Sequence, residues 1–145
     1  MRHDAALATI DQVTAILHDP ESFGSEDDVA ALIATHAAPG AMMDDAVFGA
    51  VDYRTGFFNT LYGGATDARI EVYHRSVSDD GSLGVILWRW YGTNAAGNPF
   101  DLPGISLEEF DDQGRITYEL VTYPYPDEYV QEAVFGAGTQ IATTD

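Results

Sequence analysis

The chain contains no cysteine and no lysine, and it has only four histidines. Without cysteine it can form no disulfide, offers no thiolate nucleophile and builds no cysteine-based metal site. The histidines are isolated, with no His-x-His or His-x-x-x-His pair, so we expect no dedicated metal site. No glycine-rich phosphate loop opens a helix and no Gly-x-Ser-x-Gly elbow is present. We therefore expect an activity that needs no cofactor.

Positive charge is scarce as well. Six arginines stand against 24 acidic residues, which gives a net charge of −18. Such a field repels phosphate backbones and anionic lipid, so nucleic acid and membrane surfaces are poor partners and a neutral or cationic small molecule fits better. The alternative reading is that the acidic surface mainly keeps the protein soluble.

Long apolar runs are also missing. The first twenty residues interrupt their short apolar groups with Asp4, Asp11 and Asp19, unlike a signal peptide, and no run approaches the length of a membrane span. We therefore expect a cytoplasmic protein. Since 46% of the 145 residues are apolar, we expect residues 1–145 to form a single domain with its own core.

The first part of the chain has helical periodicity. Residues 4–18 place apolar side chains at helical spacing, which predicts a first helix. Ser25, followed by three acidic residues, predicts the start of a second helix that ends near residues 39–40. A third helix is predicted over residues 51–62, ending at Gly63-Gly64.

From residue 68 the apolar period changes to two, which indicates strands. The strand over 83–93 is apolar on both faces, which is typical of a central strand or of one covered by a partner chain. Residues 94–103 are rich in Gly, Asn and Pro and are predicted as a loop, and one helical turn is predicted near 127–133. The full set of predicted strands is 68–77, 83–93, 104–110 and 115–123.

Helices followed by a four-stranded meander predict the α+β class. A curved antiparallel sheet of four or more strands must cover its apolar face, and two to three N-terminal helices are available to do so. A sheet curved over helices leaves an apolar cavity at its open end, where a ligand can bind.

The tract from Trp88 to Ile116 carries a family resemblance. It runs from an aromatic strand ending in Gly-Thr (WRWYGT), through a loop ending in DLPG, to a Gly-Ile strand and the acidic turn DDQGRI. The order of these features resembles the SnoaL-like branch of the NTF2-like superfamily, which also contains ketosteroid isomerases and limonene epoxide hydrolases. The resemblance implies a cone-shaped, cystatin-like α+β barrel and a homodimer. It further implies cofactor-independent acid–base catalysis by a cyclase, isomerase, dehydratase or epoxide hydrolase on an apolar or polyketide-like molecule.

One departure from that family concerns the last strand. Members commonly end it with an Asp that acts as acid or base, whereas residues 119–124 here read ELVTYP. Three explanations stay open: another carboxylate serves, the chemistry differs, or the domain is a non-catalytic module that binds a small ligand or another protein.

Three residues are candidates for catalysis. His74 continues the face of Ile70 and Val72, although a histidine at a strand end is often only hydrogen-bonded at the surface. Glu108, or its neighbour Glu109 if that one faces inward, would have a raised pKa when buried; the alternative is a solvated edge-strand charge. By comparison with the family, Tyr118 lies on the face that reaches the pocket and would donate to a carbonyl or enolate oxygen; the alternative is simple packing.

Candidate substrate-binding residues are mostly aromatic. Trp88 and Trp90 share one strand face and would form a broad apolar wall, or equally a core against the first helix. The remaining candidates are Tyr53, Phe57 and Thr122. Asp44-Asp45 could reach the pocket mouth, but helix capping and solvation are the simpler interpretations. The second apolar face of residues 83–93, with Val85, Leu87 and Tyr91, predicts a homodimer through the outer sheet face.

Overall fold

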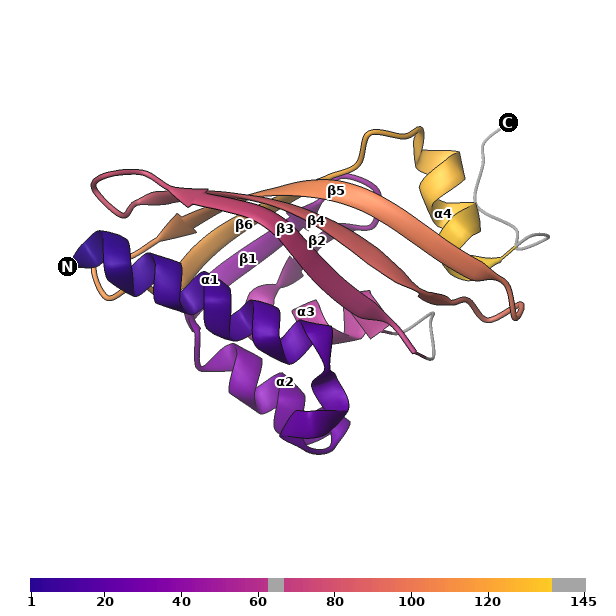
Figure 1. Ribbon diagram of the computed structural model, residues 1–145, viewed down its shortest axis with the longest axis horizontal. Helices are drawn as coiled ribbons and strands as arrows, with labels where there is room; N and C mark the ends of the chain where they lie inside the picture. The colour runs from indigo at the N-terminus through magenta and orange to yellow at the C-terminus, as the bar shows by residue number, and fades with distance from the viewer. Residues whose placement is uncertain (63–66, 137–145) are drawn as a thin grey trace.

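The computed structural model describes residues 1–62 and 67–136, with the backbone alone for 58–62 (Figure 1). The predicted third-helix end at Gly63-Gly64 lies outside these residues. The helices are α1 (Arg2–His18), η1 (Pro20–Phe23), α2 (Glu26–Ala34), α3 (Tyr53–Tyr62) and α4 (Asp127–Phe135). The strands are β1 (Ala37–Asp45), β2 (Gly49–Asp52), β3 (Arg69–Val77), β4 (Leu83–Thr93), β5 (Pro99–Phe110) and β6 (Ile116–Thr122). They form one six-stranded sheet in the order β2-β1-β6-β5-β4-β3.

Helices α1, α2 and α3 lie on one side of the long, twisted sheet, and α4 lies at one of its ends (Figure 1). This arrangement confirms the predicted α+β class and the expected coverage of the sheet by N-terminal helices. Helix α2 begins as predicted: the Ser25 hydroxyl accepts the Asp28 N–H at 3.2 Å, and the Asp28 carboxylate accepts the Ser25 N–H at 3.1 Å. These two bonds satisfy donors that a helix start otherwise leaves unpaired.

The first two strands, β1 and β2, were not predicted. Strand β1 pairs with β6 in parallel, so the sheet is mixed, while the four predicted strands, β3 to β6, pair antiparallel as expected. Pro39 and Gly40 lie within β1, and both residue types normally indicate a turn rather than a strand. The predicted loop 94–103 is also too long, because residues 99–103 already pair with β4.

Strand β4 has the two-faced character that its sequence predicts. Ile86, Trp88 and Trp90 are buried on the side that faces the helices. Val85, Leu87 and Tyr91 alternate with them and are partly exposed on the outer face. The homodimer expected through that outer face stays a prediction.

Two β-bulges interrupt the strand alternation and decide which side chains face the helices. In β3, Val72 pairs with Trp88 but His74 pairs with Leu87, so Tyr73 is an extra residue. In β6, Ile116 pairs with Phe110 but Tyr118 pairs with Glu109, so residue 117 is extra. Each extra residue moves the following side chains to the opposite face.

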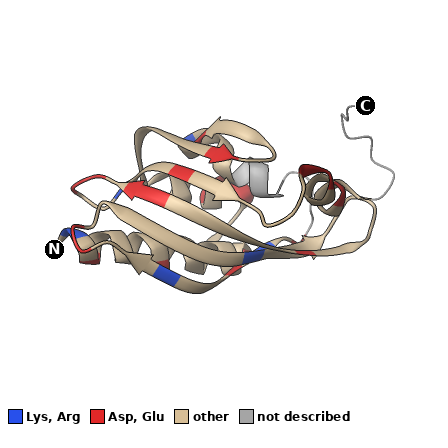
Figure 2. Cartoon of the chain, turned by 90° about the horizontal axis from the view of Figure 1, so that it is seen from above, with Lys and Arg blue, Asp and Glu red and all other residues tan. Residues whose placement is uncertain are grey.

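Charge on the molecule is distributed unevenly, with many acidic and few basic segments (Figure 2). The ion pairs of the described residues lie at the surface; for example, Arg89 donates to Asp101 at 2.6 Å and Arg69 to Glu21 at 2.8 Å. In the described part of the chain, no helix combines the length and the apolar character needed to cross a membrane.

Candidate functional site

A cavity lies between the inner face of the sheet and helices α1 and α3. It has a volume of about 650 Å³, including its open mouth. Aliphatic side chains of α1, β3 and β4 form much of its wall. The aromatic residues that line it are Tyr53, Phe57, Trp88, Trp90 and Tyr123, and the polar ones are Thr14, Asp45, Ser106, Glu108 and Glu119.

Two glutamates face each other across β5 and β6 on the cavity wall. Glu108 and Glu119 are register partners and are only 4% and 6% exposed. Burial, followed by the nearby charge of Glu119, raises the pKa of Glu108 well above its usual range. Burial raises the pKa of Glu119 to about 7, although hydrogen bonds from Ser106 and Glu108 oppose that rise. At neutral pH the pair is therefore only partly ionised: Glu108 keeps its proton, and Glu119, whose pKa is about 7, is the member that can accept or release one.

Ser106 links the glutamate pair to the tryptophan wall. Its hydroxyl oxygen accepts a hydrogen bond from Trp88 Nε1 at 2.8 Å, and it is 1% exposed. Because the indole N–H can only donate, the Ser106 hydroxyl does not give its own proton to Trp88. It hydrogen-bonds to Glu119 instead and lowers the pKa of that glutamate. This chain of donors stabilises the ionised form of Glu119.

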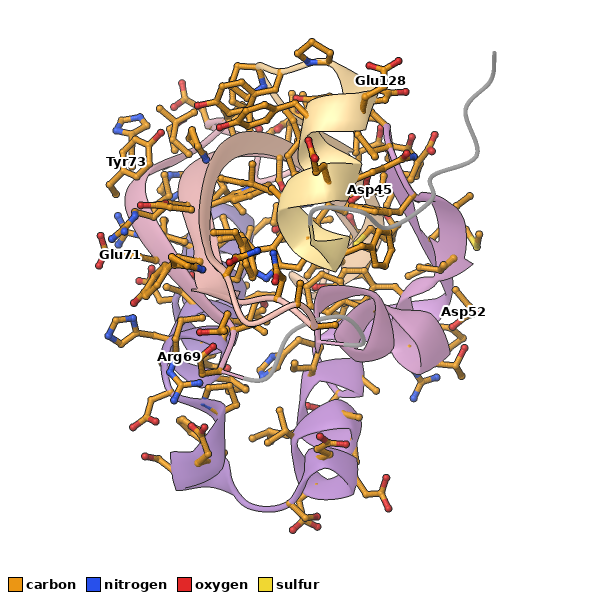
Figure 3. The ribbon with its side chains drawn as sticks, turned by 90° about the vertical axis from the view of Figure 1, so that its right-hand side faces the viewer. Asp45, Asp52, Arg69, Glu71, Tyr73 and Glu128 are labelled. Carbon is orange, nitrogen blue, oxygen red and sulfur yellow. The ribbon has the colours of Figure 1, made fainter. Side chains whose placement is uncertain are left out.

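A third buried carboxyl group, Asp45, lies at the end of β1, where Figure 3 labels it, and lines the cavity. It is 4% exposed and accepts the N–H groups of Val47 at 2.9 Å and Phe48 at 3.0 Å. Its other oxygen accepts the Tyr123 hydroxyl at 2.8 Å. Burial raises the pKa of Asp45, and these three donors oppose the rise.

Three buried polar atoms of the cavity have no hydrogen-bond partner among the described residues. They are the Tyr53 hydroxyl, Trp90 Nε1 and Glu119 Oε1. Burial, then the charges of Glu119 and Glu108, raises the pKa of Tyr53 well above its usual range, so its hydroxyl stays a donor. An unsatisfied buried polar group is costly, and these two donors and one acceptor have hydrogen-bonding capacity that no described residue uses.

The structure brings together five of the eight residues singled out in the sequence. Tyr53, Phe57, Trp88, Trp90 and Glu108 line the cavity, and Glu109 is exposed on the outer face. This resolves the choice between the two neighbouring glutamates in favour of Glu108.

The other three, His74, Tyr118 and Thr122, lie outside the cavity. His74 is exposed, because the bulge at Tyr73 turns it away from the face of Val72. Tyr118 donates its hydroxyl to Asp44 at 3.2 Å, and Thr122 donates to the Ile105 carbonyl at 3.1 Å. The expectation that the Ile116 face continues into the pocket is thus wrong, since after the bulge the inward face of β6 carries Glu119 and Val121.

Sequence reasoning missed Ser106, Glu119 and Tyr123 as site residues, and it considered Asp45 for the pocket mouth but preferred another role for it. The interpretation of Asp45 as a helix cap or a solvated charge is wrong, because it is buried and binds the turn between β1 and β2. One signal was available: Ala41, Met43 and Asp45 alternate at strand spacing, and all three are buried. In the described segments no group of three or more His, Asp or Glu side chains is arranged to hold a metal ion.

No protein-family model matches the sequence, and no curated protein matches it. Solved structures do match. A protein from Jannaschia sp. CCS1 assigned as a SnoaL-like polyketide cyclase has a TM-score of 0.66 at 18% identity, over 91% of this chain and 92% of that one. A protein from Catenulispora acidiphila with a ketosteroid isomerase-like fold, in complex with trimethylamine, has a TM-score of 0.68 at 14% identity, over 92% and 97%.

A third similar structure is SalBIII, an epoxide hydrolase/cyclase-like enzyme with a role in pyran ring formation in the polyether salinomycin. It has a TM-score of 0.61 at 15% identity, over 87% of this chain and 92% of that one. At these identities the likeness shows the fold. The chain has the NTF2-like fold, as its resemblance to the SnoaL-like branch implied.

Proposed function

We propose that the protein is an enzyme that transfers protons, without a cofactor, on a small and largely apolar carbonyl compound bound in this cavity. The observation that carries the proposal is the buried Glu108–Glu119 pair, which places an acid and a base side by side in an apolar site. The similar structures that are cyclases or cyclase-like enzymes support it at the level of the fold.

The reaction uses the atoms that lack partners. Glu119 removes a proton from the carbon next to the substrate carbonyl, and the C–H electron pair moves into an enolate. The Tyr53 hydroxyl and Trp90 Nε1 donate to the enolate oxygen, as an oxyanion hole does. Return of a proton at a different carbon completes an isomerisation. In a cyclisation the enolate carbon instead attacks a second carbonyl carbon, and the Glu108 proton neutralises the resulting alkoxide.

A second candidate function is ring closure or hydrolysis at an epoxide. The protonated state of Glu108 beside ionised Glu119 favours it. Glu108 would protonate the leaving epoxide oxygen while Glu119 takes the proton of the attacking hydroxyl or water. A substrate panel that includes both 1,3-diketones and hydroxy-epoxides separates the two candidates.

The test is exchange of carbon-bound hydrogen in D₂O, followed by NMR over a panel of cyclic enones, 1,3-diketones and polyketide-like ketones. The wild type should exchange the position next to the carbonyl, and Glu119→Gln should lower the rate by about 100-fold or more. Glu109→Gln removes an equal charge from the outer face and should leave the rate unchanged. No exchange with any panel member, or full activity in Glu119→Gln, would contradict the proposal. Binding without any turnover would instead identify a ligand-binding module.

A further inference from the structure

The cavity collects negative charge from three strands and has no positive side chain to match it. Asp45 enters from β1, Glu108 from β5 and Glu119 from β6, whereas no arginine or histidine is among the lining residues described. Five of the six arginines form ion pairs at the surface, as Arg75 does with Asp11 and Arg115 with Asp111. The sixth, Arg54, is exposed on α3.

Two features bear on the ionisation of these groups. The three hydrogen bonds that Asp45 accepts favour its carboxylate form, although burial still raises its pKa, and the glutamate pair is only partly ionised at neutral pH. Asp45 also lies near enough to Glu119 for its charge to act on that group. Burial makes ionisation of these groups costly and raises their pKa values, and a positive ligand beside them would offset that cost.

The remaining walls suit such a ligand. The rings of Tyr53 and Phe57 stack with centroids 4.5 Å apart, and Trp88 meets Tyr123 edge to face at 5.7 Å. Aromatic faces attract ammonium groups through the ring quadrupole, and proteins use them with carboxylates to recognise amines. Glu119, which is 6% exposed and lines the same cavity, adds an acceptor, Oε1, that has no partner among the described residues.

We infer that the molecule bound in this cavity carries a protonated amine or quaternary ammonium group on an otherwise apolar body, held by Asp45 and the Glu108–Glu119 pair. The inference rests on the proposed function in that both take the cavity as the substrate site. It adds the substrate class: an amine-bearing carbonyl compound, with its oxygen toward Tyr53 and Trp90 and its nitrogen toward the carboxyl groups.

Binding should depend on pH in a defined direction. The titratable groups that face the ligand are Asp45, Tyr53, Glu108, Glu119 and Tyr123, while α1, β3 and β4 contribute none to the cavity wall. A cation favours the ionised form of the glutamate pair, so its binding releases protons. Affinity for the cation should therefore fall as pH drops below about 7, where Glu119 takes up its proton.

The experiment is calorimetric titration of the protein with three probes of one ring size, in 0.15 M NaCl at pH 8 and pH 5.5. The probes are cyclohexylammonium, cyclohexanol and cyclohexanecarboxylate. At pH 8 the ammonium should bind about tenfold more tightly than the alcohol, with the carboxylate weakest, and this preference should shrink at pH 5.5. At pH 7, titrations in phosphate and in MOPS should give different binding heats, because each buffer takes up the protons that binding releases.

Amino-acid substitutions show which carboxyl groups produce the preference for the ammonium probe. Asp45→Asn and Glu119→Gln should each reduce the ammonium preference, whereas Glu109→Gln, which removes the same charge from the outer face, should keep it. If a cavity variant fails to fold, the wild-type pH series and buffer comparison still decide. Equal affinity for ammonium and alcohol, or a preference that survives in both folded cavity variants, overturns the inference. Because the probes contain no carbonyl, this result is independent of the exchange assay: either proposal can fail while the other stands.

Discussion

At the scale of single residues, Ser106 is the small group on which the ionisation of the site depends. It has one proton to donate, and because Trp88 Nε1 already donates to its oxygen, that proton acts on Glu119. Without it, burial would raise the pKa of Glu119 further, and the base would be protonated at neutral pH. In the proposed reaction Ser106 is therefore a positioning residue, which acts through Glu119 rather than by touching the substrate.

Ser106→Ala should raise the pKa of Glu119 by about one unit, which corresponds to loss of one hydrogen bond worth on the order of 1.4 kcal/mol. The pH at which exchange activity reaches half its maximum should rise with it. The measurement is the ¹³C chemical shift of the Glu119 carboxyl carbon against pH, beside the pH–rate profile. Ser76→Ala, at an exposed site on β3, is the control. An unchanged carboxyl titration in Ser106→Ala would show that the hydroxyl does not act on Glu119.

At the scale of elements, the packing of β4 against β5 shapes the cavity wall. Gly104 pairs with Trp88 across these strands, and a Cβ at residue 104 would lie 2.2 Å from Trp88 Cη2. The indole thus lies directly over the glycine, which is how it reaches Ser106 two residues further along β5. A side chain at residue 104 would push the indole into the cavity.

Gly104→Ala should lower the free energy of unfolding by about 1–3 kcal/mol, because overpacking forces the ring from its rotamer. It should also weaken ligand binding. The atoms in conflict belong to the six-membered part of the indole. The double variant Gly104→Ala/Trp88→Phe should therefore recover part of the loss relative to Trp88→Phe alone. Urea unfolding of the four proteins checks this, and strictly additive effects would mean that the two sites do not interact.

At the scale of elements, some features of the fold were predictable from the sequence and others were not. Helix α2 was predictable from its capping box, and the inner face of β4 from its alternation. Period-two reasoning failed beyond the bulges of β3 and β6, because a bulge leaves no signature in the local pattern and yet reverses every later side chain. His74 and Tyr118 were therefore selected, and Glu119 was missed. Glu108, on an uninterrupted stretch of β5, was placed correctly.

At the scale of the whole molecule, the carboxyl groups divide into an exposed majority and a buried few, and their pH responses separate. Among the exposed carboxyl groups, hydrogen bonds lower the pKa of Asp19 and of Asp80, to about 2 for Asp80, so these two gain protons only in strong acid. The buried pair gains them at much higher pH, since the pKa of Glu119 is about 7 and that of Glu108 is also raised. Between pH 5.5 and 7.5, then, the stability of the fold should report the carboxyl groups of the cavity rather than those of the surface.

The sign follows from proton uptake. A carboxyl group whose pKa is higher in the folded than in the unfolded state binds more protons when folded, so acidification through this window stabilises the protein. For Glu119 the rise from 4.5 to about 7 corresponds to about 3 kcal/mol, lost as pH increases from about 4.5 to 7, and about 2 kcal/mol of it is lost above pH 5.5. His36 opposes this trend, because burial lowers its pKa. Urea unfolding should therefore give a higher free energy at pH 5.5 than at pH 7.5.

The double variant Glu108→Gln/Glu119→Gln should lose most of this pH dependence, because its amides do not titrate. Raising NaCl from 0.05 to 0.5 M should stabilise both the wild type and the double variant, because salt screens repulsion between surface charges. The difference between the pH dependences of their unfolding free energies should remain. If the wild type and the double variant showed the same pH dependence, the surface charge would be its source, and the glutamate pair would be ionised in the folded protein. That outcome would also remove the acid from the proposed reaction, so a stability measurement tests the chemistry before any substrate is known.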